Sequence, residues 1–353
     1  MLNPGYTTIS KFLIQQVPEE PHGRELAALL VDVAAVVKAI SAAVGKGPLV
    51  GLASLAGSEN AQGEAQKKLD LLADELFARG VEWSGLVGAL ASEERDDVHF
   101  VEGKGRLALV FDPLDGSSNL DVNLPVGSIF SVLALPEGGC DTGAVLQPGS
   151  RQLAAGYAIY GPSTQVVITV GRGTHGFTLD REIGNFVLTH PDIRIPEEGS
   201  DYLINASNRR FWEPPIRRYV DECKAGKEGP RGRDFNTRWV ASMVADVHRV
   251  LLRGGIYLYP RDQKEANREG RLRLLYEANP MAMIVEQAGG AASTGRGRIL
   301  DVEPARIHQR VPVILGSRSE VARVECYHQE FDRGEDKPYS SPLFGERSLF
   351  TNA

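Results

Sequence analysis

Apolar residues along the chain recur with two different periods. Residues 24–44 carry Ala, Leu and Val at helical spacing, with Glu25 in the first turn, and the glycines at 45 and 47 are expected to end this amphipathic helix. Leucines at 69, 72 and 76 repeat the helical spacing next to Asp70. Residues 107–111 form a short continuous apolar run, which is typical of a buried strand.

The rest of the chain mixes both patterns. Strands separated by turns are predicted over residues 128–170, a further strand over 202–205, and helices near 214–224 and 238–252. We therefore expect an α/β (α+β) fold.

Three polar or glycine-rich stretches divide the chain. The proline-containing stretch 189–200 is the candidate boundary between an N-terminal domain, residues 1–195, and a C-terminal domain, residues 196–328. Residues 329–353 are predicted to be a flexible tail unless Leu343, Leu349 and Phe350 dock on a neighbour. The Gly- and Ser-rich start of residues 47–69 predicts a mobile loop that closes over a site.

Composition narrows the class of protein. The chain of 353 residues is 42% hydrophobic, is long enough for two packed domains, and shows no uninterrupted apolar run of the ~18 residues that span a bilayer. Its net charge of −7 argues against nucleic acid as a partner. Cys140, Cys223 and Cys326 are odd in number and widely spaced, which favours a reducing compartment, and the N-terminus resembles no targeting signal. We expect a cytoplasmic protein without a membrane partner.

The segment 111–119, FDPLDGSSN, carries the chemistry. The buried strand delivers Asp112 to its carboxyl end, Pro113 and Gly116 are expected to force a tight turn, and Asp112 and Asp115 can then face one point. The following Gly116, Ser117 and Ser118 offer N–H groups and hydroxyls to an anion. An isolated turn of this composition can equally be an ordinary surface turn.

Further acids support a metal site. Glu93 and Glu94 follow an apolar segment and are expected to be consecutive strand residues that point to opposite faces. Asp70 lies on the predicted helix, and Glu277 ends the stretch LRLLYE. Hard cations such as Mg²⁺ prefer oxygen ligands, so an excess of Asp and Glu without His or Cys fits such a site. Each acid alone is more often a solvated surface group.

Taken together, these segments resemble class I fructose-1,6-bisphosphatases, within the lithium-sensitive, metal-dependent sugar and inositol phosphatase superfamily. The resemblance extends from about Tyr6 to His328. The turn DPLDGSSN together with SEE is specific to the family, and other motifs separate the bisphosphatases from their inositol-cleaving relatives. The matching motifs are QKKLD (66–70), SEE (92–94), FDPLDGSSN (111–119), AAGYAIYGPS (154–163), SMVADVHR (242–249), GGIYLYP (254–260), LRLLYEANPMA (272–282) and EQAGG (286–290).

The resemblance implies a two-domain layered αβαβα sandwich and Mg²⁺-dependent hydrolysis of the 1-phosphate of fructose 1,6-bisphosphate by an activated water, in gluconeogenesis or the Calvin cycle. Two or three Mg²⁺ ions per site are expected, with Mn²⁺ as a possible substitute. Asp70 and Glu94 are the expected catalytic bases. The expected metal ligands are Glu93, Glu94, Asp112, the carbonyl of Leu114, Asp115 and Glu277.

The same resemblance implies the residues that bind substrate. Arg238 stands where the family uses an arginine that crosses a subunit interface, so a homo-oligomer is expected, and a tetramer in particular. The expected substrate-binding residues are Asp115, Gly116, Ser117, Ser118, Asn205, Arg238, Trp239, Met243, Tyr257, Leu258, Tyr259 and Arg271.

Some positions depart from the family pattern. Arg271 replaces a lysine, and Trp239 and Asn208 replace tyrosines that contact the distal phosphate. Sedoheptulose-1,7-bisphosphatase or dual activity therefore remains an alternative, and a non-catalytic sugar-phosphate sensor is a third. The positions expected to bind AMP hold Arg24, Ala27 and the pair Arg106-Leu107, which predicts weak control by AMP.

Overall fold

The computed structural model describes residues 5–17, 22–51, 55–59, 65–103, 105–137, 141–264 and 268–337, with the backbone alone at 48, 50, 55–59 and 65–67. The α-helices are α1 (Ile9–Gln16), α2 (Gly23–Lys46), α3 (Lys68–Glu82), α4 (Pro214–Ala225), α5 (Met243–Arg253), α6 (Asn279–Gln287) and α7 (Arg318–Asp332). A π-helical turn, Leu274–Ala278, precedes α6.

An eight-stranded sheet forms the larger half of the fold. Its strands lie in the order β10-β9-β8-β7-β6-β5-β3-β4, and only β3 and β5 pair in parallel. The strands are β3 (Val87–Ser92), β4 (His99–Phe100), β5 (Leu107–Asp115), β6 (Val126–Ala134), β7 (Ala154–Tyr160), β8 (Thr164–Thr169), β9 (His175–Asp180) and β10 (Asn185–His190).

A five-stranded sheet forms the other half, in the order β12-β11-β13-β17-β15. Two further pairs, β1–β2 and β14–β16, are two-stranded and antiparallel. The strands are β11 (Asp201–Leu203), β12 (Asn236–Thr237), β13 (Ile256–Tyr259), β15 (Ala291–Ser293), β17 (Val313–Gly316), β1 (Leu55–Glu59), β2 (Ala65–Lys67), β14 (Leu272–Arg273) and β16 (Arg310–Val311).

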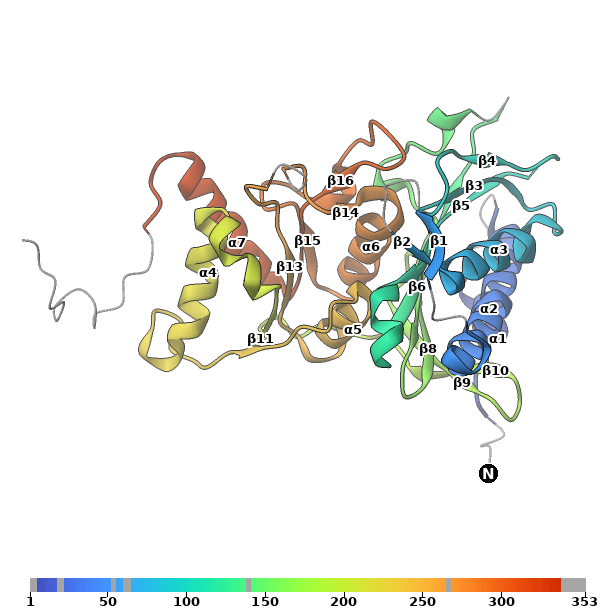
Figure 1. Cartoon of the computed structure of the whole chain (residues 1–353), viewed down its shortest axis with the longest axis horizontal. Coiled ribbons are helices and arrows are strands. Elements are labelled where there is room, and N and C mark those ends of the chain that lie inside the picture. The colour runs from blue at the N-terminus through green and yellow to red at the C-terminus, as the bar shows by residue number, and fades with distance from the viewer. Residues whose placement is uncertain are drawn as a thin grey trace, which may run out of the picture.

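The elements stack in five layers, as the resemblance predicted (Figure 1). Alternation along each strand sends successive side chains to opposite faces of a sheet. Phe130 therefore packs with α1, α2 and α3, whereas Ile129 packs with α5 and α6. Tyr257 faces the same middle layer from the second sheet, and Leu258 faces α4 and α7. The order of layers is helices, sheet, helices, sheet, helices.

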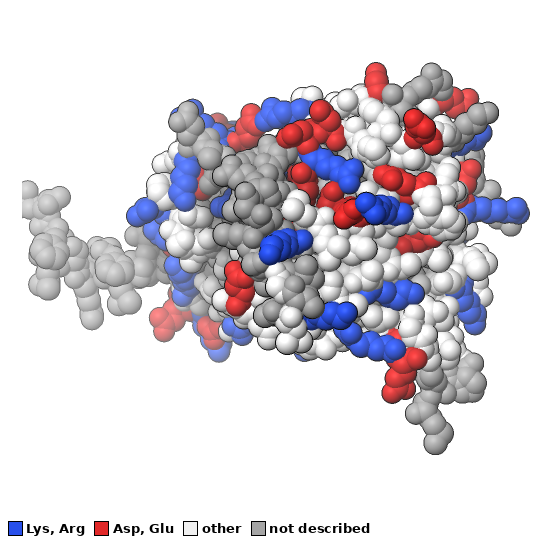
Figure 2. Space-filling view, turned by 45° about the vertical axis from the view of Figure 1, so that its right-hand side comes forward, with Lys and Arg blue, Asp and Glu red and all other residues white. Residues whose placement is uncertain are grey.

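Helix α2 is long and apolar enough, by length and composition, to cross a membrane. Here its apolar face, including Leu29, Val33 and Ile40, is buried against the larger sheet and its neighbouring helices. The helix thus serves as a core helix. On the face of the molecule in Figure 2, basic and acidic side chains are intermixed, so the net charge is not gathered there in one patch of a single sign.

Three sequence-based predictions of local structure need correction. Strand β5 continues through Pro113 to Asp115, because a register irregularity against β6 between Asp112 and Asp115 accommodates the proline, and the turn begins at Gly116. Helix α5 begins at Met243 rather than at 238, since Ser242 is its N-cap. Glu93 and Glu94 lie in a turn after β3 and not within a strand.

The prediction of a flexible tail over residues 329–353 is wrong for the first residues of that stretch. Helix α7 continues to Asp332 because Val324 and Tyr327 still face the core on its last turns. Beyond the helix, Arg218 of α4 donates a hydrogen bond to Asp336 at 3.2 Å. Residues 338–353 and Cys140 lie outside the described residues. In the expected loop 47–69, the described parts form a 3-10 turn (Gly47–Val50), β1, β2 and the start of α3.

Candidate active site

Three carboxylates meet at the junction of the two sheets. Asp112 and Asp115 come from the end of β5 and Glu277 from the π-helical turn, and one ligand oxygen of each lies within 4.8 Å of the others. All three are buried, which is rare for acids without a compensating charge. Single π-helical turns are frequent at functional sites because they redirect one side chain.

The electrostatics of this cluster favour a bound cation. Burial raises the pKa of Asp112 well above its usual range, and the neighbouring carboxylates, Glu93 first, raise it further. Burial and then Glu93 raise the pKa of Glu277 to about 8. Such acids are poorly stable as a set of bare anions, and a divalent cation between them would remove the penalty. The donor set therefore fits a hard metal ion.

Arg273 is an active-site residue that sequence reasoning missed. Its buried guanidinium lies 2.8 Å from Glu93 and 3.9 Å from Glu277, and its backbone N–H donates to Glu277 Oε2 at 2.6 Å. Arg273 thus supplies positive charge to the carboxylate cluster. The available signal was a charged residue placed among the leucines of LRLLYE, which requires a buried partner.

Asp115 also fixes the start of α5. Its carboxylate accepts hydrogen bonds from Ser242 Oγ at 2.6 Å and from the backbone N–H groups of Met243 and Val244 at 3.2 and 2.9 Å. Burial raises the pKa of Asp115, and these hydrogen bonds oppose the rise. Gly116 follows with a φ of 73°, and a Cβ there would lie 2.7 Å from the Ser242 Cβ. Only glycine allows this close approach.

The other predicted acids come from neighbouring elements. The Glu93 N–H donates to the Phe111 carbonyl at 3.1 Å, so the turn after β3 sits beside the end of β5. Asp70, 3% exposed, lies in the first turn of α3. Arg95 joins these two elements through a 2.8 Å ion pair with Asp74 of α3. Helix α3, the turn after β3 and the end of β5 are thereby held next to one another, although they are separate in sequence.

These side chains line a single cavity of about 400 Å³. It brings together most of the predicted site residues and adds Ala241, Leu272 and Arg273, which were not predicted. The predicted residues in its lining are Asp70, Glu93, Glu94, Asp112, Leu114, Asp115, Gly116, Ser117, Ser118, Asn205, Trp239, Met243, Tyr257, Tyr259, Arg271 and Glu277.

Aromatic side chains form one wall of the cavity, which we call the distal end. Trp239 stacks on Tyr257 with ring centroids 6.1 Å apart and an interplanar angle of 8°. Tyr259 completes this wall, and the Arg271 guanidinium lies 5.9 Å from the Tyr259 ring centroid. An aromatic face beside a cation suits the apolar surface of a sugar and a phosphate.

Two predicted site residues are not in the lining of this cavity. Leu258 is fully buried in the core between the second sheet and α4 and α7, because strand alternation turns it away from Tyr257 and Tyr259. Arg238 is exposed, and its guanidinium donates to the Thr237 carbonyl of its own chain at 3.0 Å. Asn208 does not line the cavity either, and its side-chain oxygen accepts a 2.8 Å hydrogen bond from Lys264.

Comparison with known proteins gives consistent matches over nearly the whole chain. Residues 7–191 match the family described as "Fructose-1-6-bisphosphatase, N-terminal domain", and residues 195–329 match "Fructose-1-6-bisphosphatase, C-terminal domain". A class 1 fructose-1,6-bisphosphatase of Methylibium petroleiphilum is 53% identical over 99% of both chains, and one of Hydrogenophilus thermoluteolus is 54% identical over 97% of both. The crystal structure of Leishmania major fructose-1,6-bisphosphatase in holo form, 39% identical, superimposes with a TM-score of 0.87 over 92% of this chain and 100% of that one.

Proposed function

The chain belongs to the class 1 fructose-1,6-bisphosphatase family, and from that premise we propose that it hydrolyses the 1-phosphate of D-fructose 1,6-bisphosphate to fructose 6-phosphate and phosphate. The reaction is a phosphoric monoester hydrolysis. The observation that carries the proposal is the convergence of Asp112, Asp115 and Glu277 within 4.8 Å in a cavity that also has a cationic and aromatic end.

We assign the metal-binding role to the buried acids. Two or three Mg²⁺ ions, with Mn²⁺ as a substitute, fit this all-oxygen donor set. When bound, these ions lower the pKa of a water molecule and stabilise charge on the phosphate and the leaving oxygen. The proposed ligands are Glu93, Glu94, Asp112, Asp115, Glu277 and the carbonyl oxygen of Leu114, all of which belong to residues that line the cavity.

We assign the proton transfer to Asp70 and Glu94. Both line the cavity, and they come from different elements, α3 and the turn after β3. A carboxylate near the attacking water accepts its proton as the new P–O bond forms. The phosphoryl group would lie against Gly116, Ser117 and Ser118, whose N–H and hydroxyl groups can donate to its oxygens.

We assign the distal phosphate and the sugar to the other end of the cavity. The residues proposed to bind them, Asn205, Trp239, Met243, Tyr257, Tyr259 and Arg271, all line the cavity. The Arg271 guanidinium is exposed and can bind a phosphate through two N–H groups. Holding this end would fix the position of the 1-phosphate relative to the acids, and such positioning lowers the barrier to reaction.

We also propose a homo-oligomer, specifically a tetramer, in the cytoplasm. Exposed Arg238 could then reach the distal end of a partner's cavity instead of its own. An apolar groove between α1 and α2 leaves Ile14 78% exposed, which suits contact between copies. Buried Cys223 and exposed Cys326 are both free, as expected in a reducing compartment.

A second candidate substrate is sedoheptulose 1,7-bisphosphate. The observation that favours it is the altered distal end, where Trp239 replaces a tyrosine and the Asn208 side chain is bonded to Lys264. Phosphate release from both bisphosphates, from sugar monophosphates and from inositol phosphates, with and without Mg²⁺, tests both candidates. Mg²⁺-dependent release from fructose 1,6-bisphosphate with fructose 6-phosphate as product is expected. No release from either bisphosphate would overturn the proposal and leave a non-catalytic sensor.

A further inference from the structure

The residues 231–242, here called the 231–242 segment, bring Trp239 and Ala241 to the cavity without support from a long element. Its one regular element is β12, two residues that pair in parallel with β11. The Arg238 N–H adds a hydrogen bond to the Tyr202 carbonyl at 3.1 Å. So short a strand cannot by itself fix the Trp239 ring, and other contacts must hold the segment.

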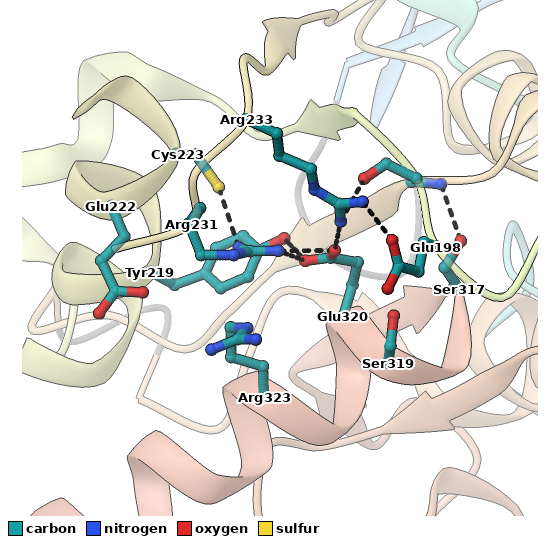
Figure 3. A network of polar contacts seen from close by, with 12 residues as sticks. Glu198, Tyr219, Glu222, Cys223, Arg231, Arg233, Ser317, Ser319, Glu320 and Arg323 are labelled. Atoms are coloured by element: carbon teal, nitrogen blue, oxygen red, sulfur yellow. Dashed lines mark hydrogen bonds and ion pairs between the residues drawn. The ribbon is translucent and has the colours of Figure 1, made fainter. Parts of the chain in front are cut away.

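The first anchor of the segment is Glu320 of α7 (Figure 3). The Arg231 guanidinium lies 2.7 Å from both oxygens of this buried carboxylate, and the Arg233 guanidinium lies 2.5 Å from Oε1. Tyr219 of α4 donates to Glu320 Oε2 at 2.6 Å. Charge-assisted hydrogen bonds of this kind fix the orientation of both groups, and breaking them is costly because it leaves a buried charge uncompensated.

Further contacts of Arg233 and Phe235 extend the first anchor along the segment. Arg233 also donates to Glu198 at 2.6 Å and to the Gly199 carbonyl at 3.1 Å. The Phe235 ring lies under both guanidinium groups, 4.5 Å from that of Arg231 and 4.9 Å from that of Arg233. The positive charges of the two arginines are thus balanced by two glutamates. The chain runs directly from this cluster into β12.

The second anchor lies at the metal end of the cavity. The Val240 N–H donates to Asp246 Oδ1 at 3.0 Å, and the Val240 carbonyl accepts from Asn119 Nδ2, also at 3.0 Å. Asn119 belongs to the turn that follows Asp115. Directly after the second anchor, Ala241 has a φ of 64°, a left-handed conformation that persists only where surrounding contacts impose it.

We propose that the 231–242 segment is a positioning element in which Glu320 and Asp246 act through Trp239 to set the affinity for the distal half of the bisphosphate. The segment is tied at one end to α7 and at the other to the turn that directly follows Asp112 and Asp115 on β5. The Trp239 ring is therefore held at a fixed distance from the acids. This inference rests on the proposed assignment of Trp239 to substrate binding.

Two substitutions test the first anchor. Arg233→Met keeps the aliphatic chain of a side chain that is 31% exposed, and Glu320→Gln removes the buried charge. For each folded variant, KM for the bisphosphate is expected to rise about tenfold while kcat changes less than about twofold. If Glu320→Gln does not fold, Arg233→Met decides.

Product inhibition separates positioning from general loosening. The inhibition constant of fructose 6-phosphate, which keeps the distal phosphate, should rise in parallel with KM, and that of inorganic phosphate should not change. The matched control is Asp332→Asn, which lies on α7 like Glu320 and removes an ion pair with Arg296 of the turn after β15. It should change neither constant. The variant Asp246→Ala should repeat the pattern from the second anchor.

The proposal fails if KM and the constant for fructose 6-phosphate stay at the wild-type values in folded Arg233→Met. It also fails if the constant for inorganic phosphate rises equally, since the anchors would then support the whole cavity. The comparison variant is Trp239→Ala. An unchanged KM in Trp239→Ala would refute the assignment of Trp239 to substrate binding. If KM rises in Trp239→Ala but not in the anchor variants, only the role of the anchors is refuted.

Discussion

The acidic and the distal ends of the cavity are built from different kinds of structure. At the acidic end, Asp112 and Asp115 belong to one strand that is buried along its whole length, and a short stretch of sequence places both. At the distal end, Trp239 lies in a loop and Arg271 is exposed, and contacts from α7 and α5 determine the geometry. The comparison indicates that the pair of acids on β5 is encoded locally, whereas the position of Trp239 depends on long-range packing.

The largest expected effect is at the acidic end. Asp112→Asn should fold normally yet lose activity on the order of 1,000-fold at saturating Mg²⁺, because removal of a central anionic ligand weakens cation binding and water activation. The control is Asp97→Asn, an exposed acid in the turn after Glu93 and Glu94, which should keep full activity. Steady-state kinetics decide, and activity of Asp112→Asn within a few-fold of the wild type would contradict the metal assignment.

The distal end should respond through binding. Arg238→Ala should raise KM about tenfold and lower kcat less, because a lost charge-assisted hydrogen bond to the distal phosphate lies far from the bond that is cleaved. The measurement is KM for fructose 1,6-bisphosphate. Arg253→Ala, at the exposed end of α5, serves as the control for removing a surface arginine. An unchanged KM for Arg238→Ala would show that Arg238 binds the substrate neither in its own cavity nor in that of a partner subunit.

A smaller effect concerns stability at different pH. The pKa of Glu277 is raised to about 8 in the folded metal-free protein, above its unfolded value of 4.5, so the folded state retains a proton that the unfolded state has lost. Stability of the metal-free protein should therefore fall as the pH rises from 4.5 through 8. In EDTA we expect Tm to drop by a few degrees over this range.

Saturating Mg²⁺ should reduce this pH dependence, because the cation stabilises the ionised carboxylates. Thermal unfolding with EDTA and with Mg²⁺ makes the comparison. Equal slopes of Tm against pH in EDTA and in Mg²⁺ would show that the buried acids do not share a cation. Trp239 is not one of the clustered acids, so Trp239→Ala should leave both slopes of Tm against pH unchanged.

The smallest expected effect is that of AMP. Ala27 offers no hydroxyl, and Leu107 is fully buried in the core under α1 to α3, so neither can hydrogen-bond to a nucleotide. Loss of two such bonds to charged groups weakens binding by about two orders of magnitude or more. AMP at cellular concentrations should therefore inhibit weakly or not at all. Half-inhibition at low micromolar AMP would show that this interpretation of Arg24, Ala27 and Leu107 is wrong.

The same difference between the two ends explains what sequence could predict. The helix at 24–44, the strand before Asp112 and the αβαβα layers were predicted, since periodicity and the family motifs specify them. The acids of the cavity lie in contiguous motifs and were named in advance. Arg273 was missed because the charged position in LRLLYE does not identify its partner, and its pairing with Glu93 joins segments about 180 positions apart.

The remaining errors of the sequence interpretation arise where strand alternation or contacts between distant segments set the structure. Leu258 was included although alternation between two tyrosines of β13 turns it to the opposite face of the sheet. The start of α5 was placed at 238, but Asp115 and Ser242 fix it at Met243 through contacts that join residues more than 100 positions apart. Such contacts between distant segments cannot be read from a hydrophobic pattern.

The central claim is that Asp112, Asp115 and Glu277 together bind the catalytic cation. Anomalous diffraction from crystals of the active enzyme soaked with Mn²⁺ tests it directly, because the signal locates the metal without reference to activity. We predict peaks at bonding distance from oxygens of all three carboxylates, near 2.1 to 2.2 Å as is usual for roughly octahedral oxygen sites. Peaks elsewhere in the molecule, with none between these three side chains, would contradict the account.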